Sequence, residues 1–185
     1  MPDFMDIFEK EYAPKLGIRT NSFRQLIALA CRNGVKHIVE TGSLRDPGSW
    51  QGDGQSTFIF YNYAVLSDAK FVTIDKDKEA IANVIKYCPD AVPINGDSVE
   101  VLSQLSGPVD LLYLDASASN GQAHCLLEYI IAIPILAKGC IVCADDSPND
   151  KHGTVHGKGA YLAKFLEIRG FKKVISGYQT AWVIE

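Results

Sequence analysis

Acidic residues occur repeatedly at or directly after short runs of apolar and β-branched residues in this sequence. A carboxylate at the end of a buried strand can bind a hydroxyl group, an amino group or a cation of a ligand. In chain order these acids are Glu40, Asp75, Asp97 and Asp115. One acid in such a position is often only a surface residue, but four in succession predict one shared binding site.

Strand-like runs alternate with helical patterns along the chain, and this order would position the acids. The expected strands are Lys36–Thr41, Phe71–Asp75, Ala91–Asn95, Val109–Asp115, Gly139–Asp145, Phe171–Ser176 and Thr180–Ile184. The expected helices are Ser22–Arg32, Gln55–Leu66, Lys76–Tyr87, Ser98–Leu105, Gly121–Leu136 and Gly157–Arg169. Because strands that alternate with helices form parallel sheets, the acids are expected to meet at the carboxyl edge of one sheet.

The last two expected strands are joined by only three residues, Gly177, Tyr178 and Gln179. That connection is too short for a parallel crossover, so the pair is expected to be an antiparallel hairpin. We therefore predict an α/β fold with one Rossmann-like domain over residues 1–185. It would have a mostly parallel seven-stranded sheet, an antiparallel C-terminal hairpin and helices on both faces. Residues 1–21 would form a helical extension, and residues 22–185 the core.

Glycines near Glu40 indicate how a ligand would approach the backbone. Gly42 lies two positions after Glu40, whose carboxylate could bind a cationic amino group. Gly54 leads into the expected helix Gln55–Leu66, whose first-turn N–H and hydroxyl groups could bind a ligand carboxylate. The stretch Ser43–Trp50 lengthens the loop between the two glycines, which departs from a tight GxGxxG loop.

Together these features resemble the class I methyltransferases that use S-adenosylmethionine (AdoMet), over residues Val35 to Glu185. Within that class the chain is most similar to small O-methyltransferases of the cation-dependent, catechol and macrolide-sugar types. The resemblance implies methyl transfer from AdoMet to a hydroxyl of a small molecule, with Asp75 on the ribose and Asp97 and Ser98 at the adenine edge. The implied cofactor-binding residues are Glu40, Gly42, Ser43, Gln55, Ser56, Asp75, Lys76, Asp97, Ser98 and Asp115.

The cation-dependent subset carries acids after its fourth and fifth strands, and this chain has Asp115 followed by Asp145 and Asp146 there. Since adjacent strand ends lie roughly 5 Å apart, the three carboxylates could converge on one cation. Hard oxygen ligands suit Mg²⁺, which would bind the acceptor hydroxyl and lower its pKa. The alternative is that Asp145 and Asp146 only cap the following loop.

The catalytic base is less well defined by the sequence. The catechol-type pattern has a lysine three residues after the fourth-strand acid, where this chain has Ala118. His124, on the following helix, is the first candidate beside Asp115, and His152 and His156 come next.

Two further segments carry residues that could act on a ligand or serve the fold alone. The segment Gly157-Lys158-Gly159 would allow close approach of a ligand or simply cap a helix. Trp50 and Arg45, on the lengthened loop, could cover the ligand, or Trp50 could anchor that loop. Tyr178 could line the acceptor side.

The 185-residue chain has a net charge of −4 and no run of basic residues, which disfavours nucleic acid as a partner. Its longest apolar run, Tyr129–Ala137, is too short to span a membrane, and we expect a cytoplasmic protein. Of five cysteines, Cys140 and Cys143 lie in one expected strand and should point to opposite faces as free thiols.

The expected partner is a hydroxylated small molecule, with a homodimer possible. Phe4, Ile7, Phe8 and Tyr12 form an apolar stripe at helical spacing. This stripe could pack on the core, cover the acceptor or contact a second subunit, and core packing is the default expectation.

Three other functions fit parts of the pattern. A metal-independent methyltransferase acting on another acceptor would be insensitive to chelators. An NAD-dependent oxidoreductase would share the Rossmann-like features, but a pyrophosphate cradle close behind the first strand would be expected. A non-catalytic AdoMet-binding module would bind S-adenosylhomocysteine without transferring a methyl group.

Overall fold

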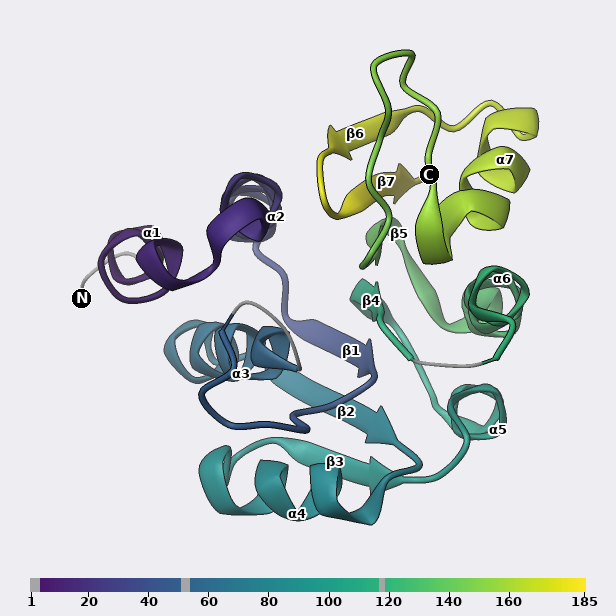
Figure 1. Cartoon of the computed structure of the whole chain (residues 1–185). Coiled ribbons are helices and arrows are strands. Elements are labelled where there is room, and N and C mark those ends of the chain that lie inside the picture. The colour runs from purple at the N-terminus through teal and green to yellow at the C-terminus, as the bar shows by residue number, and fades with distance from the viewer. Residues whose placement is uncertain (1–3, 51–53, 117–118) are drawn as a thin grey trace.

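The computed structural model describes residues 4–50, 54–116 and 119–185 (Figure 1). The strands in these ranges are β1 (His37–Thr41), β2 (Lys70–Asp75), β3 (Val92–Asn95), β4 (Val109–Leu114), β5 (Leu136–Ala144), β6 (Lys173–Ser176) and β7 (Thr180–Ile184). The α-helices are α1 (Phe4–Ile7), α2 (Thr20–Asn33), α3 (Gln55–Ser67), α4 (Lys78–Tyr87), α5 (Ser98–Gln104), α6 (Gly121–Ala132) and α7 (Ala160–Ile168). Strands and helices alternate from β1 onward, as the sequence predicts.

The strands form one sheet in the order β3-β2-β1-β4-β5-β7-β6. Strands β1 to β5 pair in parallel, and β7 pairs antiparallel with both β5 and β6. The predicted fold class is therefore confirmed, including the terminal hairpin. The hairpin folds back so that its second strand, β7, lies next to β5. The order reverses between β1 and β4, where open α/β sheets commonly bind ligands outside the carboxyl ends of their strands.

Side chains of successive strand residues alternate between two apolar cores, one on each face of the sheet. Ile38 packs with helices α2 and α3, whereas its neighbour Val39 packs with α5, α6 and α7. In β5, Cys143 belongs to the first core and Cys140 to the second, and both are free thiols. The prediction that these two cysteines face opposite sides is confirmed.

Some element boundaries differ from the sequence-based expectation for local reasons. Helix α4 begins only at Lys78, because the Asp77 side chain caps it by accepting the Glu79 N–H at 2.8 Å. Helix α6 ends at Ala132, and a 3₁₀ turn follows at Ile133–Ile135, which contains a proline that disfavours further α-helix. Strand β5 consequently starts at Leu136, earlier than expected.

The N-terminal extension is helical, with π- and 3₁₀-helical turns after α1, at Phe8–Tyr12, Ala13–Lys15 and Gly17–Arg19. Phe4, Phe8 and Tyr12 are buried in the core formed with α2 and α3, and Ile7 packs against it. Of the three roles considered for this stripe, core packing is the one that the structure shows. Over the described ranges, no helix combines the length and apolar character needed to cross a membrane.

Candidate functional site

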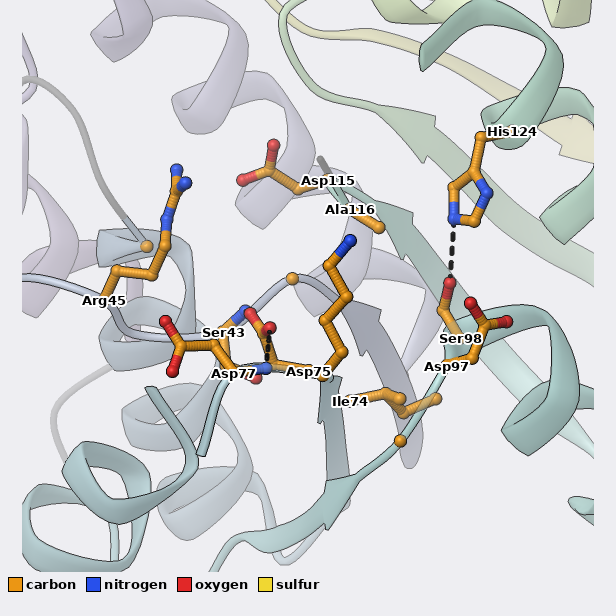
Figure 2. Close-up of a pocket in the computed structure, with 14 residues that line it drawn as sticks. Ser43, Arg45, Ile74, Asp75, Asp77, Asp97, Ser98, Asp115, Ala116 and His124 are labelled. Atoms are coloured by element: carbon orange, nitrogen blue, oxygen red, sulfur yellow. Dashed lines mark hydrogen bonds between the residues drawn. The ribbon is translucent and has the colours of Figure 1, made fainter. Parts of the chain in front are cut away.

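A pocket lies at the carboxyl ends of the parallel strands, next to the point where the strand order reverses (Figure 2). Seven of the predicted cofactor-binding residues line it: Gly42, Ser43, Asp75, Lys76, Asp97, Ser98 and Asp115. The pocket also has lining residues that were not predicted as ligands: Ile74, Asp77, Gly96 and Ala116. These four are immediate neighbours of predicted residues, so the pocket lies at the strand ends to which the sequence points.

Gly42 lines the pocket at a place where the backbones that follow β1 and β4 approach each other closely. Gly42 has a φ of +85°, and a Cβ there would lie 2.8 Å from the backbone oxygen of Asp115. The Asp115 N–H in turn donates to the Thr41 carbonyl at 2.9 Å. Only glycine fits at position 42 without displacing the neighbouring strand end.

Asp75 lies on the pocket wall and orders the loops around it. Its Oδ2 accepts the Ser43 N–H at 2.8 Å and its Oδ1 accepts the Asp77 N–H at 2.9 Å (Figure 2). A carboxylate can accept about four hydrogen bonds, so these two leave capacity for the hydroxyls of a ligand. This geometry is compatible with the ribose-binding role that the sequence predicts.

His124 also lines the pocket, on the side of Ser98 and Asp97 (Figure 2). Its Nε2 lies 3.0 Å from Ser98 Oγ and 3.4 Å from Glu128 Oε1. The nearby buried Glu128 carboxylate raises the pKa of His124, and burial only partly opposes this effect. The first candidate base is thus located at the end of the pocket predicted for adenine.

The other candidate bases lie outside this pocket. His152 and His156 are exposed in the loop after β5, and His156 pairs with Asp150 at 3.1 Å. Ala118, where the catechol-type pattern has lysine, lies outside the described residues, as do Gln51 to Asp53 of the lengthened loop. Neither His152 nor His156 is therefore placed to take a proton from an acceptor in this pocket.

The lengthened loop packs on the core through Trp50 and reaches the pocket through Arg45. Trp50 is half-buried and stacks on Tyr12 and Phe58, with ring centroids 5.6 and 6.1 Å apart. Arg45 instead lines the pocket. Trp50 therefore anchors the end of the loop, and at Arg45 the backbone carbonyl accepts a hydrogen bond from Asn83 Nδ2 at 2.9 Å.

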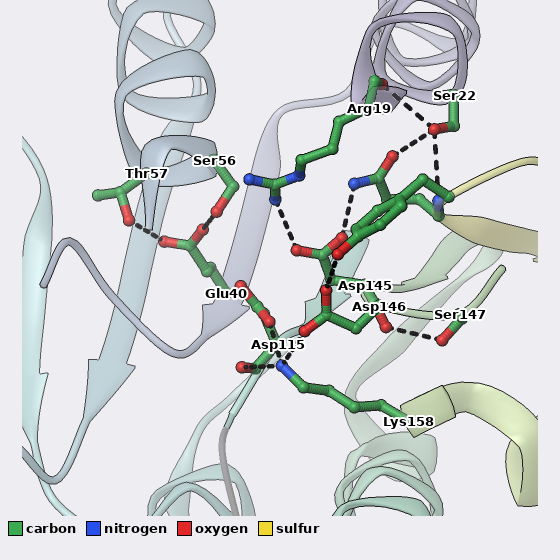
Figure 3. Close-up of polar contacts among 12 residues, drawn as sticks. Arg19, Ser22, Glu40, Ser56, Thr57, Asp115, Asp145, Asp146, Ser147 and Lys158 are labelled. Carbon is green, nitrogen blue, oxygen red and sulfur yellow. Dashed lines mark hydrogen bonds and ion pairs between the residues drawn. The ribbon is translucent and has the colours of Figure 1, made fainter. Parts of the chain in front are cut away.

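Glu40 is not among the residues that line the pocket, and its carboxylate points toward Ser56 and Thr57 of α3 (Figure 3). Its carboxylate accepts hydrogen bonds from the hydroxyls of Ser56, Thr57 and Thr73 at 2.6, 2.8 and 2.7 Å. Complete burial raises the pKa of Glu40 to about 7, and the three hydroxyls only partly offset this effect. The structure thus gives Glu40 a different position from the predicted contact with a ligand amino group, because helix α3 provides its partners.

Gln55 and Ser56, which were predicted to bind the cofactor, are also fully buried and outside the pocket lining. Gln55 donates from Nε2 to the Asp46 carbonyl at 2.7 Å, and Ser56 donates to Glu40. Both side chains therefore tie the start of α3 to the lengthened loop and to β1. Of this segment, Gly54 lines the pocket.

Asp145, directly after β5, forms a buried ion pair with Arg19 of the N-terminal extension (Figure 3). Arg19 Nη2 lies 2.6 Å from Asp145 Oδ2, and Gln179 Nε2 donates to Oδ1 at 2.6 Å. Burial lowers the pKa of Arg19, but the surrounding acidic groups outweigh burial and raise it. Both oxygens of Asp145 are therefore bound by side chains of the chain itself.

Asp115 and Asp146 share a second cation, Lys158 (Figure 3). Lys158 Nζ lies 2.5 Å from Asp115 Oδ1 and 2.9 Å from Asp146 Oδ2. Burial lowers the pKa of Lys158, but the two carboxylates outweigh burial and raise it. Tyr178 donates its hydroxyl to Asp146 Oδ1 at 2.6 Å, which raises the Tyr178 pKa to about 12.

The expected convergence of Asp115, Asp145 and Asp146 on one Mg²⁺ is thus replaced by contacts with Arg19 and Lys158. Within the ranges that the structure describes, no group of three or more His, Cys, Asp or Glu side chains is arranged to hold a metal ion. The physical reason is that each carboxylate already faces a cationic side chain. Sequence reasoning missed Arg19, which lies in the extension, and considered Lys158 only as part of a cap or close approach.

A family model described as a methyltransferase domain matches residues 48–147, more than half of the sequence. The chain belongs to this methyltransferase family. The predicted resemblance to class I methyltransferases is therefore confirmed. No curated protein matches the sequence.

Several solved structures share the fold of this methyltransferase. The methyltransferase PaMTH1 from Podospora anserina, bound to S-adenosylhomocysteine (SAH), has 17% identity and a TM-score of 0.61, covering 100% of this chain and 88% of that one. The O-methyltransferase TomG from Streptomyces achromogenes, in complex with AdoMet, has 15% identity and a TM-score of 0.57, covering 100% and 91%. MycE of the mycinamycin pathway, in complex with Mg, SAH and mycinamycin VI, has 16% identity and a TM-score of 0.66, and this chain covers 54% of it. At these identities the similarity shows the fold alone.

Proposed function

We propose that this methyltransferase transfers the methyl group of AdoMet to a hydroxyl of a small molecule. The observation that carries the proposal is the pocket in Figure 2, because it joins residues from four successive strand ends in one wall. Asp75, Asp97 and Asp115 are three of the four acids that the sequence singles out, and all three line it. Such a set of acids is suited to a ligand with hydroxyl, amine and adenine groups along its length.

The assignment of parts of AdoMet to parts of the pocket follows the order of the strands. Asp75, after β2, would bind the ribose hydroxyls, and Asp97 and Ser98, after β3, would bind the adenine edge. Asp115, after β4, would lie near the amino group and the methyl donor. The acceptor oxygen would bond to the methyl carbon as the carbon–sulfur bond breaks, SAH would leave, and the hydroxyl proton would pass to water or a base.

A small hydroxylated acceptor is favoured over a nucleic acid. The net charge of −4 provides little electrostatic attraction for a polyanion. TomG is an O-methyltransferase involved in tomaymycin synthesis, and MycE was determined with mycinamycin VI. Methylation of a hydroxyl on a comparable small molecule is the acceptor chemistry that these neighbours suggest.

The residues present do not fit a divalent cation as they are arranged. A Mg²⁺ bound by Asp115, Asp145 and Asp146 would have to displace Lys158 and compete with Arg19 for the same carboxylate oxygens. No step of the proposed reaction is therefore assigned to Mg²⁺.

Calorimetric titration with SAH tests the cofactor assignment, with NAD⁺ titrated in parallel. We expect SAH to bind and NAD⁺ not to bind, and Asp75→Ala should weaken SAH binding about tenfold or more through loss of the ribose contact. Asp90→Ala, an exposed acid outside the pocket lining, is the matched control and should bind SAH like the wild type. Binding of NAD⁺ without SAH would refute the proposal.

A radiolabelled methyl-transfer screen over phenolic and sugar hydroxyls then tests the reaction itself. Transfer to a hydroxylated acceptor, lost in Asp75→Ala, is the expected result. SAH binding without transfer to any acceptor would instead support a non-catalytic AdoMet-binding module.

A further inference from the structure

Lys158 is carried by a turn that packs directly on the backbone after β5. Gly157 has a φ of +68°, and a Cβ there would lie 1.9 Å from the Asp146 carbonyl oxygen. The Lys158 N–H donates to that same carbonyl at 3.1 Å. Because a side chain at position 157 would collide with backbone, glycine is required for this approach, and the approach fixes where the lysine side chain begins.

The ammonium group of Lys158 lies within 3.1 Å of three oxygen atoms, two of which accept hydrogen bonds from it. It contacts Asp115 Oδ1 at 2.5 Å, the Asp115 carbonyl at 3.1 Å and Asp146 Oδ2 at 2.9 Å. The Lys158 and Asp115 side chains are only 17% and 14% exposed, so this pair is well shielded from solvent. A pair that is shielded from solvent and joined by two hydrogen bonds differs from most exposed ion pairs, which contribute little.

The charge of the cluster matches that of a metal site. Three carboxylates, Asp115, Asp145 and Asp146, meet two side-chain cations, Arg19 and Lys158. Two monovalent cations carry the same total charge as one divalent ion. The net charge left on the cluster is therefore the same as if Mg²⁺ were bound by the three carboxylates alone.

We propose that Arg19 and Lys158 take the place of a divalent cation in this methyltransferase, and that Lys158 is the positioning residue that fixes Asp115 at the pocket. This inference rests on the proposed function, since Asp115 matters because it lines the AdoMet pocket. The enzyme would then bind no divalent cation at the ends of β4 and β5. Its carboxylates would be ordered before any ligand arrives.

Removal of the lysine charge should convert the cluster into a metal site. In Lys158→Met three carboxylates would face only Arg19, and hard oxygen ligands of this kind bind Mg²⁺ and Mn²⁺. We expect electron paramagnetic resonance to show no tight Mn²⁺ binding to the wild type but about one bound Mn²⁺ per chain in Lys158→Met. Mg²⁺ should likewise raise the Tm of the variant by a few degrees and leave the wild-type Tm unchanged.

Three further variants separate this effect from a general loss of structure. Lys164→Met removes an exposed lysine of α7 and should bind no Mn²⁺. Lys158→Arg keeps the charge and should also bind none. The double variant Lys158→Met/Asp115→Asn removes one charge of each sign. It should be at least as stable as Lys158→Met and, with only two carboxylates left, should bind no Mn²⁺.

Metal binding is measured without AdoMet or an acceptor, so its outcome is distinct from that of the SAH titration. Tight binding of Mn²⁺ to the wild-type chain at this cluster, abolished by Asp145→Asn, would overturn the inference. Failure of folded Lys158→Met to bind Mn²⁺ more tightly than Lys164→Met would also overturn it.

Discussion

Replacement of Glu40 by glutamine tests whether this residue supports the fold or binds the cofactor. The Glu40 carboxylate is completely buried, and its three described hydrogen-bond donors are neutral hydroxyls. Its pKa of about 7 is raised from an ordinary value of 4.5, mainly by burial. Glutamine has the same shape and can keep hydrogen bonds to hydroxyls, but it does not titrate.

The raised pKa of Glu40 determines whether the folding stability rises or falls with pH, and by how much. Between pH 4.5 and 7 the folded state keeps a proton on Glu40 that the unfolded chain has lost, so stability decreases as the pH rises through this window. At about 1.4 kcal/mol per unit, a rise from 4.5 to about 7 corresponds to about 3 kcal/mol. Above pH 7 this contribution is constant. In Glu40→Gln it is absent at every pH.

Urea unfolding at several pH values between 5 and 8 measures this difference. The free energy of unfolding of Glu40→Gln minus that of the wild type should increase with pH by about 2–3 kcal/mol and level off above pH 7. Glu79→Gln, at an exposed position in the first turn of α4, is the control and should show a nearly constant difference. SAH affinity should be unchanged in both variants.

Two results would refute this reasoning. A difference that does not vary with pH would mean that Glu40 is ionised throughout, with a partner other than the three hydroxyls. A tenfold loss of SAH affinity in a stable Glu40→Gln protein would restore the direct contact with the ligand amino group that the sequence suggested.

Three other substitutions follow from the geometry of the site. Gly42→Ala should lower stability by about 1–3 kcal/mol and weaken SAH binding, because its Cβ would press on the end of β4, as scanning fluorimetry and calorimetry would show. Glu128→Gln should lower the pKa of His124 in an NMR titration, because loss of the carboxylate removes the main cause of the raised pKa. In the wild type, the stability that this pair contributes is present below the pKa of His124 in the unfolded chain and is lost as the pH rises through its pKa in the folded protein. Arg19→Met should cost about 3–5 kcal/mol by leaving Asp145 buried and unpaired, and Arg19→Met/Asp145→Asn should recover most of this loss in urea unfolding.

The sequence predicts the sheet well because its signals are local. Short apolar runs alternate with helical patterns, and each run ends where the observed strand ends to within a residue. The antiparallel hairpin was predictable because three residues cannot form a crossover. The start of β5 at Leu136 was missed because the 3₁₀ turn containing Pro134 interrupts an apolar stretch that looks continuous with α6.

The partners of the site residues were much less predictable than the positions of those residues. Arg19 pairs with Asp145 across 126 positions of the sequence, and nothing around Arg19 marks it as a residue of the site. Lys158 was visible only through its flanking glycines, whose role depends on the close approach of the Asp146 backbone. Contacts of this kind depend on how the N-terminal extension and the loop after β5 pack over the sheet edge.

An acid at the carboxyl end of a strand therefore has a predictable place but not a predictable partner. Asp75 faces the pocket because its loop neighbours bind it only through backbone N–H groups and leave capacity for a ligand. Glu40 lies further back on β1, opposite Thr73 rather than Asp75 in the register of the two strands, and hydroxyls of α3 and β2 surround it outside the pocket lining. Asp145 is held by Arg19 and Gln179. The elements that pack above each strand end therefore decide which of these acids can meet a ligand. In this chain the same elements carry Arg19 and Lys158, whose positive charges lie where the sequence predicts a metal ion.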